Sequence, residues 1–256
     1  MKKTMRIMIL ILAIGIIAFS GYKLWNIYSE YAAGNKLYDD YANRFIINTV
    51  EAGQVEEVEE AAFSIDFDAL LAENQDVVGW IYSEATPINY PIVQSSNNDY
   101  YLRRLLDGSY NIAGSIFMDY RNSSDFTDLH TIIYGHNLKD GTMFGSLKEY
   151  RNQEYYEKHP VINLYTPEAD YLIEIMAGYQ TDIYSNIYSF PETREELESL
   201  YEEITRLSTF KSDLLLEEGD RLITLSTCTY GADISRYVLI GKISLSHSEL
   251  VEESVF

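Results

Sequence analysis

Hydrophobic and polar positions divide the chain into one long apolar segment at the N-terminus and many short apolar runs after it. Residues 7–19 are apolar apart from a single glycine, and three basic residues precede them: Lys2, Lys3 and Arg6. About 20 residues are needed to cross a bilayer. The segment reaches that length only if it extends to about Trp25, with the Lys23 ammonium reaching back to the interface.

We interpret residues 1–25 as an uncleaved membrane anchor. No small-x-small cleavage site closes the apolar run, which argues against a removable signal peptide. A cleaved signal and a buried helix remain the alternatives. The basic flank predicts a single-pass protein with a cytoplasmic N-terminus and the rest of the chain outside the cell.

The pattern after the anchor changes from helix to strand. Residues 22–50 read as helical, so we expect a helical stalk or linker over 26–62. Period-two and short apolar runs then predict eight strands, which span residues 77–82, 88–93, 114–119, 130–134, 161–165, 171–181, 221–227 and 236–245. So many short strands with few helices predict a mainly β fold, a closed or nearly closed barrel over 63–248. Pro91 is expected to confine its strand to an edge or a bulge.

Few helices interrupt the strands. Asp66 can cap a short helix over 66–74, and short helical segments are expected over 99–106 and 144–150. A longer helix over 191–209 precedes the last two strands, with Ser189 as its expected N-cap. Its apolar positions recur at helical spacing: Leu197, Leu200, Tyr201, Ile204 and Leu207.

The charge of the chain excludes one class of partner. Lys and Arg total 19 against 40 Asp and Glu, for a net charge of −21. A protein this acidic offers no electrostatic match to a phosphate backbone, so we expect no nucleic-acid binding. Without the anchor the excess of acid is larger still, and residues 249–256 form an acidic tail. We interpret that charge as a solvated surface.

Cys228 is the only cysteine in the chain. A disulfide framework is therefore excluded, and a lone thiol in an oxidising compartment suggests catalysis. It ends the strand Thr-Leu-Ser-Thr-Cys, where a substrate can reach it. A thiolate is the nucleophile, so a nearby cation matters. The candidates are His136, at the end of another strand, and Arg236, at the start of the last one. His130 and Arg221 lie at the wrong ends of their strands.

These segments resemble the class B sortases, the cysteine transpeptidases of Gram-positive bacteria. The strand that ends in Cys228, the Tyr-Gly-His-Asn segment around His136, and Arg236 eight residues after the cysteine all match in order. The Gly-Ser-Ile-Phe-Met-Asp strand at 114–119 and the Asp-Tyr-Tyr-Leu-Arg segment at 99–103 also match. The resemblance covers about 67–245 and implies an eight-stranded sortase barrel with N-terminal helices and an extra helix before the catalytic strand.

The resemblance implies roles for individual residues. Cys228 would attack the threonine carbonyl of a C-terminal sorting signal and form a thioacyl enzyme, His136 would move protons, and Arg236 would stabilise the oxyanion. Four residues would line the peptide groove: Asn98, Leu102, Tyr134 and Ser226. The implied partners are surface proteins with a Pro-x-Thr type signal, and an amine of the cell-wall precursor as acceptor. No cofactor and no metal are implied.

Three other functions stay open from the sequence. A secreted cysteine peptidase would pass the acyl group to water, although papain-like enzymes place the cysteine before the histidine. An anchored acidic binding module would use no thiol. A pilin-polymerising sortase often has a further C-terminal membrane segment, which the acidic end of this chain is too short to supply. No zinc, redox, phosphate-loop or dinucleotide motif occurs.

Overall fold

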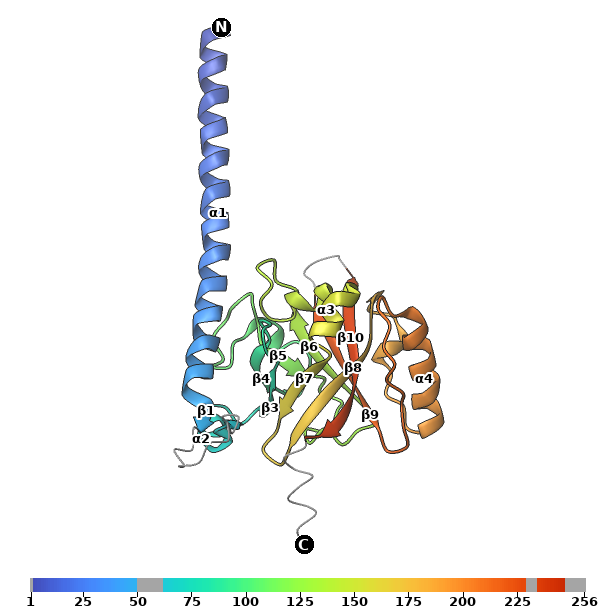
Figure 1. The fold of residues 1–256 in the computed structure, drawn as a ribbon. Helices are drawn as coiled ribbons and strands as arrows, with labels where there is room; N and C mark the ends of the chain where they lie inside the picture. The colour runs from blue at the N-terminus through green and yellow to red at the C-terminus, as the bar shows by residue number, and fades with distance from the viewer. Residues whose placement is uncertain (1, 50–61, 229–233, 247–256) are drawn as a thin grey trace.

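The chain forms a β-barrel from which one long helix extends well beyond the barrel's end (Figure 1). The computed structural model describes residues 2–49, 62–228 and 234–246. Its helices are α1 (Lys2–Phe45), α2 (Phe67–Glu73), α3 (Gln153–Lys158) and α4 (Arg194–Leu207). Three short 3-10 helices lie between strands: η1 (Tyr101–Arg103), η2 (Gly145–Arg151) and η3 (Asn186–Tyr188).

The predicted closed barrel of eight strands is confirmed. Its strands follow the order β10-β8-β7-β3-β4-β5-β6-β9, and β9 closes the ring by pairing with β10. Their bounds are β3 (Val77–Tyr82), β4 (Asn89–Val93), β5 (Ile116–Met118), β6 (His130–His136), β7 (Val161–Tyr165), β8 (Asp170–Asp182), β9 (Arg221–Cys228) and β10 (Ser235–Leu245). The pairs β4–β5 and β6–β9 are parallel and the others antiparallel. Closure leaves no exposed strand edge in the barrel.

Pro91 does not lie on an edge strand, which corrects the expectation from sequence. Strand β4 pairs with β3 on one side and with β5 on the other. The parallel ladder to β5 begins only at Ile92, one residue after the proline, so the missing N–H of Pro91 interrupts no pair on that side. The irregularity lies in the neighbouring strand, where the register shifts between Val77 and Gly79.

The long helix before β9 begins later than the sequence suggests. It spans Arg194–Leu207, and its N-cap is Thr193, whose hydroxyl accepts from the Glu196 backbone N–H at 3.3 Å. The predicted cap, Ser189, is wrong because this residue ends η3 instead. The predicted apolar positions Leu197, Leu200 and Ile204 are buried against β8, β9 and β10. The Asp66 cap of α2 is confirmed by its bond from the Ala69 N–H at 3.0 Å.

Helix α1 ends at Phe45, earlier than the helical segment predicted to residue 50. Strand β1 (Ile46–Thr49) follows at once and pairs with β2 (Ala62–Ile65). Ile46, Ile47 and Thr49 are β-branched and favour an extended backbone once a partner strand is present. The rest of the predicted stalk, 50–61, lies outside the described residues, as does the acidic tail.

The N-terminal half of α1 is exposed and apolar, and its C-terminal half is docked on the barrel. The exposed part contains a window with a mean hydropathy of 2.2, long and apolar enough to cross a bilayer. Further along, the buried Tyr38 hydroxyl donates to the Gly114 carbonyl at 2.8 Å and lies 2.9 Å from Ser115 Oγ. Asn111 Nδ2 donates to the Glu30 carbonyl at 2.9 Å. One continuous helix therefore joins the apolar segment to the barrel.

The direction of α1 distinguishes the two ends of the barrel. In Figure 1 the arrow of strand β10 points away from the end of the barrel toward which α1 extends, so the first residues of β10 lie at that end. Asn35 of α1 also lies 3.4 Å from Asp140, in the segment that follows β6. The end of the barrel that carries the ends of β6 and β9 and the start of β10 is thus the end nearer the apolar segment.

Candidate active site

Strands β6 and β9 are parallel and end together. Their last residues, His136 and Cys228, are Cα partners in the ladder. The Asn137 N–H donates to the Cys228 carbonyl at 3.0 Å, which extends the pairing one residue past β6. Two residues that lie 92 positions apart in the sequence are neighbours for this reason.

Strand β10 returns antiparallel to β9 and brings Arg236 to the same place. Val238 lies opposite Ser226, and the Tyr237 N–H donates to Thr227 Oγ1 at 2.8 Å. Arg236 is the next residue toward the end of the barrel. It lines the same cavity of about 380 Å³ as Cys228.

This cavity contains three of the four residues expected to bind substrate. Its lining consists of Asn98, Leu102, Phe117, Arg121, Tyr134, Ile183, Tyr188, Cys228 and Arg236. Ser226 does not line it. This serine is fully buried beneath the wall, and its hydroxyl lies 2.9 Å from the hydroxyl of Tyr188, through which it contacts the cavity indirectly.

His136 is held by the backbone of η1. Its Nε2 lies 2.6 Å from the Leu102 carbonyl oxygen, and the side chain is buried. A carbonyl oxygen only accepts, so Nε2 carries the proton of the neutral ring, and Nδ1 is its basic nitrogen. The histidine is therefore oriented by a residue that itself lines the cavity.

Comparison with known proteins identifies the family. A family model of the sortase domain matches residues 81–244. The sortase B of Listeria monocytogenes is 35% identical over 241 residues, which cover 91% of this chain and 94% of that protein. The chain belongs to the sortase family, class B.

Solved sortase structures agree with the barrel. The Bacillus anthracis sortase B in complex with AAEK1 is 36% identical and superposes with a TM-score of 0.73, over 86% of this chain and all of that one. The Staphylococcus aureus sortase B–substrate complex is 31% identical with a TM-score of 0.71, over 85% and 97% of the two chains. The chain is thus a cysteine transpeptidase of the sortase B type.

The candidate site holds Cys228 and His136 in neutral forms. Burial raises the pKa of the Cys228 thiol to about 11, although the Arg236 guanidinium opposes the shift. Burial also lowers the pKa of His136, against the Leu102 and Cys228 backbone groups beside its ring, which favour the charged form. At neutral pH the dominant species pairs a thiol with an uncharged imidazole, because each group is buried from water.

Four cavity residues escaped the sequence analysis: Phe117, Arg121, Ile183 and Tyr188. Ile183 and Tyr188 belong to the segment between β8 and α4, which approaches the site only through the tertiary fold. Arg121 had a usable signal. It stands two residues after Asp119, in the loop that follows β5, and binding residues are often on loops held by a rigid scaffold.

The residues rejected as partners of Cys228 lie elsewhere. His130 starts β6 and is buried, with its ring nitrogens 3.0 Å from the Ser189 carbonyl and 2.8 Å from Thr224 Oγ1. Burial lowers its pKa to about 4, so it stays neutral. Arg221 starts β9, the end of that strand opposite Cys228.

Proposed function

We propose that this sortase is a membrane-anchored enzyme that cleaves a C-terminal sorting signal after threonine and transfers the protein to an amine of the cell-wall precursor. The main support is that Cys228 and Arg236 share one cavity while His136 pairs with Cys228 across the β6–β9 ladder. A cation and a base beside a single thiol are the parts that acyl transfer through sulfur needs.

The first half of the proposed reaction forms a thioester. Cys228 Sγ attacks the threonine carbonyl as His136 Nδ1 takes the thiol proton, and the Arg236 guanidinium donates to the oxygen as it gains charge. The C–N bond then breaks, and the leaving amine takes the proton from His136. Because the thiol pKa is raised, the proton transfer to His136 accompanies attack instead of preceding it.

The second half reverses these proton transfers. The incoming amine attacks the thioester carbonyl and gives a proton to His136. The C–S bond breaks, a new amide bond forms, and the thiolate of Cys228 is reprotonated. Among the groove residues, we assign peptide contacts to Asn98, Leu102 and Tyr134, and to Ser226 a supporting role through its contact with a cavity tyrosine.

Anchoring is proposed from α1. Its apolar window, the basic residues before it and Trp25 near its end fit a single span with a cytoplasmic N-terminus. The docked half of the helix would then hold the active-site end of the barrel toward the membrane. We place the anchor at 1–25, the docked helical segment and linker at 26–62, the catalytic barrel at 63–248 and the acidic tail at 249–256.

A peptide panel tests the reaction. Five-residue Pro-x-Thr peptides, each followed by a leaving segment, are incubated with the enzyme, and mass spectrometry follows the acyl enzyme and its transfer to added amines. Cys228→Ala and Cys228→Ser should abolish cleavage and leave the melting temperature near that of the native enzyme. Near-native turnover by either variant would end this assignment.

Fractionation tests the anchor. The full chain should stay with membranes after high-salt washing, because apolar burial is insensitive to salt screening. A chain that starts at Asn26 keeps the docked half of α1 and should be released into the soluble fraction. Release of the full chain by salt alone would argue against a span.

A further inference from the structure

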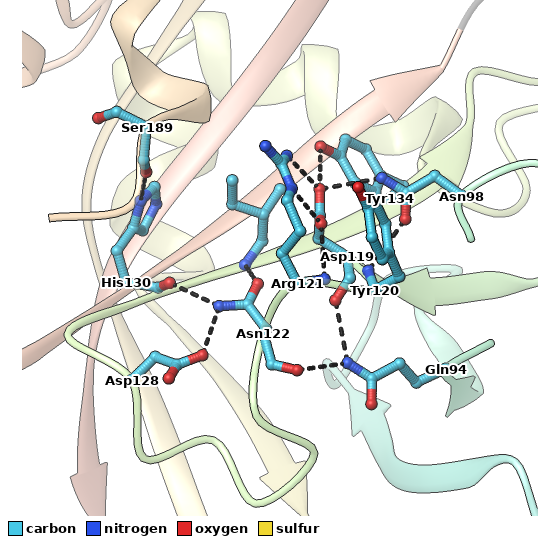
Figure 2. A network of polar contacts seen from close by, with 11 residues as sticks. Gln94, Asn98, Asp119, Tyr120, Arg121, Asn122, Asp128, His130, Tyr134 and Ser189 are labelled. Carbon is cyan, nitrogen blue, oxygen red and sulfur yellow. Dashed lines mark hydrogen bonds and ion pairs between the residues drawn. The ribbon is translucent and has the colours of Figure 1, made fainter. Parts of the chain in front are cut away.

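Asp119 is a buried carboxylate that holds three side chains of the cavity wall (Figure 2). Its side chain is fully buried and accepts two bonds from the Arg121 guanidinium, at 2.8 and 2.7 Å. Asn98 Nδ2 and the Tyr134 hydroxyl each donate to Oδ2 at 3.0 Å. All three donors line the cavity that contains Cys228.

Burying the charged carboxylate of Asp119 costs free energy, and the hydrogen bonds from its neighbours offset that cost. Burial alone would raise the pKa of Asp119, but the hydrogen bonds from Arg121, Asn98 and Tyr134 outweigh it and keep the pKa below its usual value. A buried ion pair is often no more stable than an apolar pair of similar size. Stability is therefore weak grounds for keeping it, and its position directly behind three side chains that line the cavity suggests a role in recognition.

Arg121 is fixed in place with hydrogen-bonding capacity to spare. Its guanidinium carbon lies 4.3 Å from the ring centroid of Phe190, which belongs to the segment between β8 and α4. The side chain is 44% exposed. Its bonds to Asp119 use two of its five N–H groups, and no hydrogen bond among the described residues uses the other three. The guanidinium is therefore held by the Asp119 carboxylate and by the Phe190 ring, and it still lines the cavity.

The sign of charge in the cavity is opposite to that of the chain. Its lining includes two cations, Arg121 and Arg236, and no acidic residue among the part of the chain that the structure describes. The whole sequence carries a net charge of −21. Such a site favours ligand groups rich in oxygen acceptors and disfavours basic side chains.

We propose that Arg121 is a specificity-determining residue of this sortase, which donates hydrogen bonds to an oxygen of the sorting peptide, and that Asp119 is the residue that positions it. The oxygen is a backbone carbonyl or an acidic side chain of the peptide. The assignment rests on the proposed function, because it requires that the cavity bind the peptide.

Steady-state kinetics of Arg121→Gln test the proposed role of Arg121. The full-length enzyme in detergent is assayed on cleavable peptides, and Arg206→Gln, an exposed change on α4, is the control for loss of one positive charge. A hydrogen bond from a charged donor predicts a roughly 10- to 100-fold rise in KM for Arg121→Gln with kcat little changed. The control should match the native enzyme.

Two peptide series identify the oxygen. In one series each variable position is glutamate and in the other it is glutamine. An equal penalty of Arg121→Gln in both series indicates a backbone carbonyl, and a penalty confined to glutamate indicates a carboxylate. A KM equal to that of the control in both series would overturn the proposal.

A double-mutant cycle tests the positioning role of Asp119. Asp119→Asn should raise KM in the native background and have a clearly smaller effect in the Arg121→Gln background, because its action passes through that arginine. Fully additive effects would show that Asp119 has only a structural role, and would overturn the positioning assignment. Should Asp119→Asn fail to fold, the single variant Arg121→Lys tests the same pairing outside the cycle: lysine keeps the charge but not the bidentate fork that Asp119 holds, so KM should rise, and a native KM would overturn the positioning assignment.

These experiments distinguish failure of the Arg121 assignment from failure of the proposed function. If the native enzyme cleaves no peptide, the proposed function fails and the role of Arg121 fails with it. If the native enzyme cleaves peptides and Arg121→Gln behaves like its control, only the specificity assignment is refuted.

Discussion

Replacing Gly114 by alanine should damage the active site from outside the cavity. Gly114 has a φ of +59°, and a Cβ built on it would lie 2.6 Å from the Leu102 carbonyl oxygen and 2.8 Å from that of Tyr101. The same Leu102 oxygen accepts the Nε2 proton of His136. An added methyl group must therefore push away the carbonyl that orients the proposed catalytic base.

The cost of this change has two parts. A left-handed backbone conformation costs a residue with a Cβ roughly 1–2 kcal/mol. Overpacking against backbone atoms, which cannot rotate away, adds about 1–3 kcal/mol. Because about 1 kcal/mol shifts the melting temperature of a domain of this size by roughly 2–4 °C, Gly114→Ala should lower it by about 4–20 °C. Displacing the imidazole by part of an ångström should also cost about tenfold or more in kcat.

Gly219 provides the matched control. Its φ is +90°, and nothing lies within 4 Å of the corresponding Cβ position. It also precedes β9 at the end away from Cys228. Gly219→Ala should thus cost only the backbone strain, with a fall in melting temperature of about 2–8 °C and native turnover.

Differential scanning calorimetry and peptide cleavage by the full-length enzyme in detergent measure both effects. If Gly114→Ala retains native kcat while its melting temperature falls, the Leu102 carbonyl does not position His136. If the two glycine variants behave alike, the steric argument itself is wrong.

Three further outcomes follow from the site and the fold. Alkylation of Cys228 by iodoacetamide should accelerate as pH rises toward the thiol pKa of about 11, because only the thiolate reacts; a plateau near neutral pH would mean a preformed thiolate. Arg236→Lys keeps the charge but loses the planar fork, so kcat should fall roughly 100- to 1,000-fold with little change in KM. Unchanged turnover with weaker binding would make Arg236 a substrate clamp. Thr193→Ala removes the N-cap of α4, which should cost about 1 kcal/mol of stability and lower the melting temperature by roughly 2–4 °C. Ser189→Ala should leave the melting temperature unchanged.

The sequence predicted the parts of this protein that are local. A run of apolar residues that follows basic ones predicts the apolar half of α1, whatever the rest of the chain packs against. Short apolar runs and alternating apolar positions predict the eight strands, because a strand buries one face with a period of two, or both faces where it is covered on each side. Cys228 was found in the same way, as a single thiol at the end of such a strand, with His136 and Arg236 at neighbouring strand ends.

Non-local pairing decided the features that the sequence missed. Pro91 looked like an edge residue because its lost N–H is a local property, yet the ladder to β5 simply begins one residue later. Residues 46–49 read as helix because the strand that pairs with them, Ala62–Ile65, lies outside the local sequence pattern. The cap of α4 moved from Ser189 to Thr193 because the earlier serine follows the turn of η3, where its carbonyl contacts His130.

The cavity beside Cys228 depended most on tertiary structure. Asn98, Arg121 and Tyr134 come from three separate segments, and the pairing of β5 with β4 and β6 brings them around the carboxylate of Asp119. Sequence pattern records which residues are apolar and which are polar, and so it predicted the barrel and the place of its single thiol at a strand end. Burial depends on what covers a residue in space, so the tertiary structure alone decided that this aspartate is enclosed, that the Cys228 thiol stays protonated, and which arginine faces the cavity.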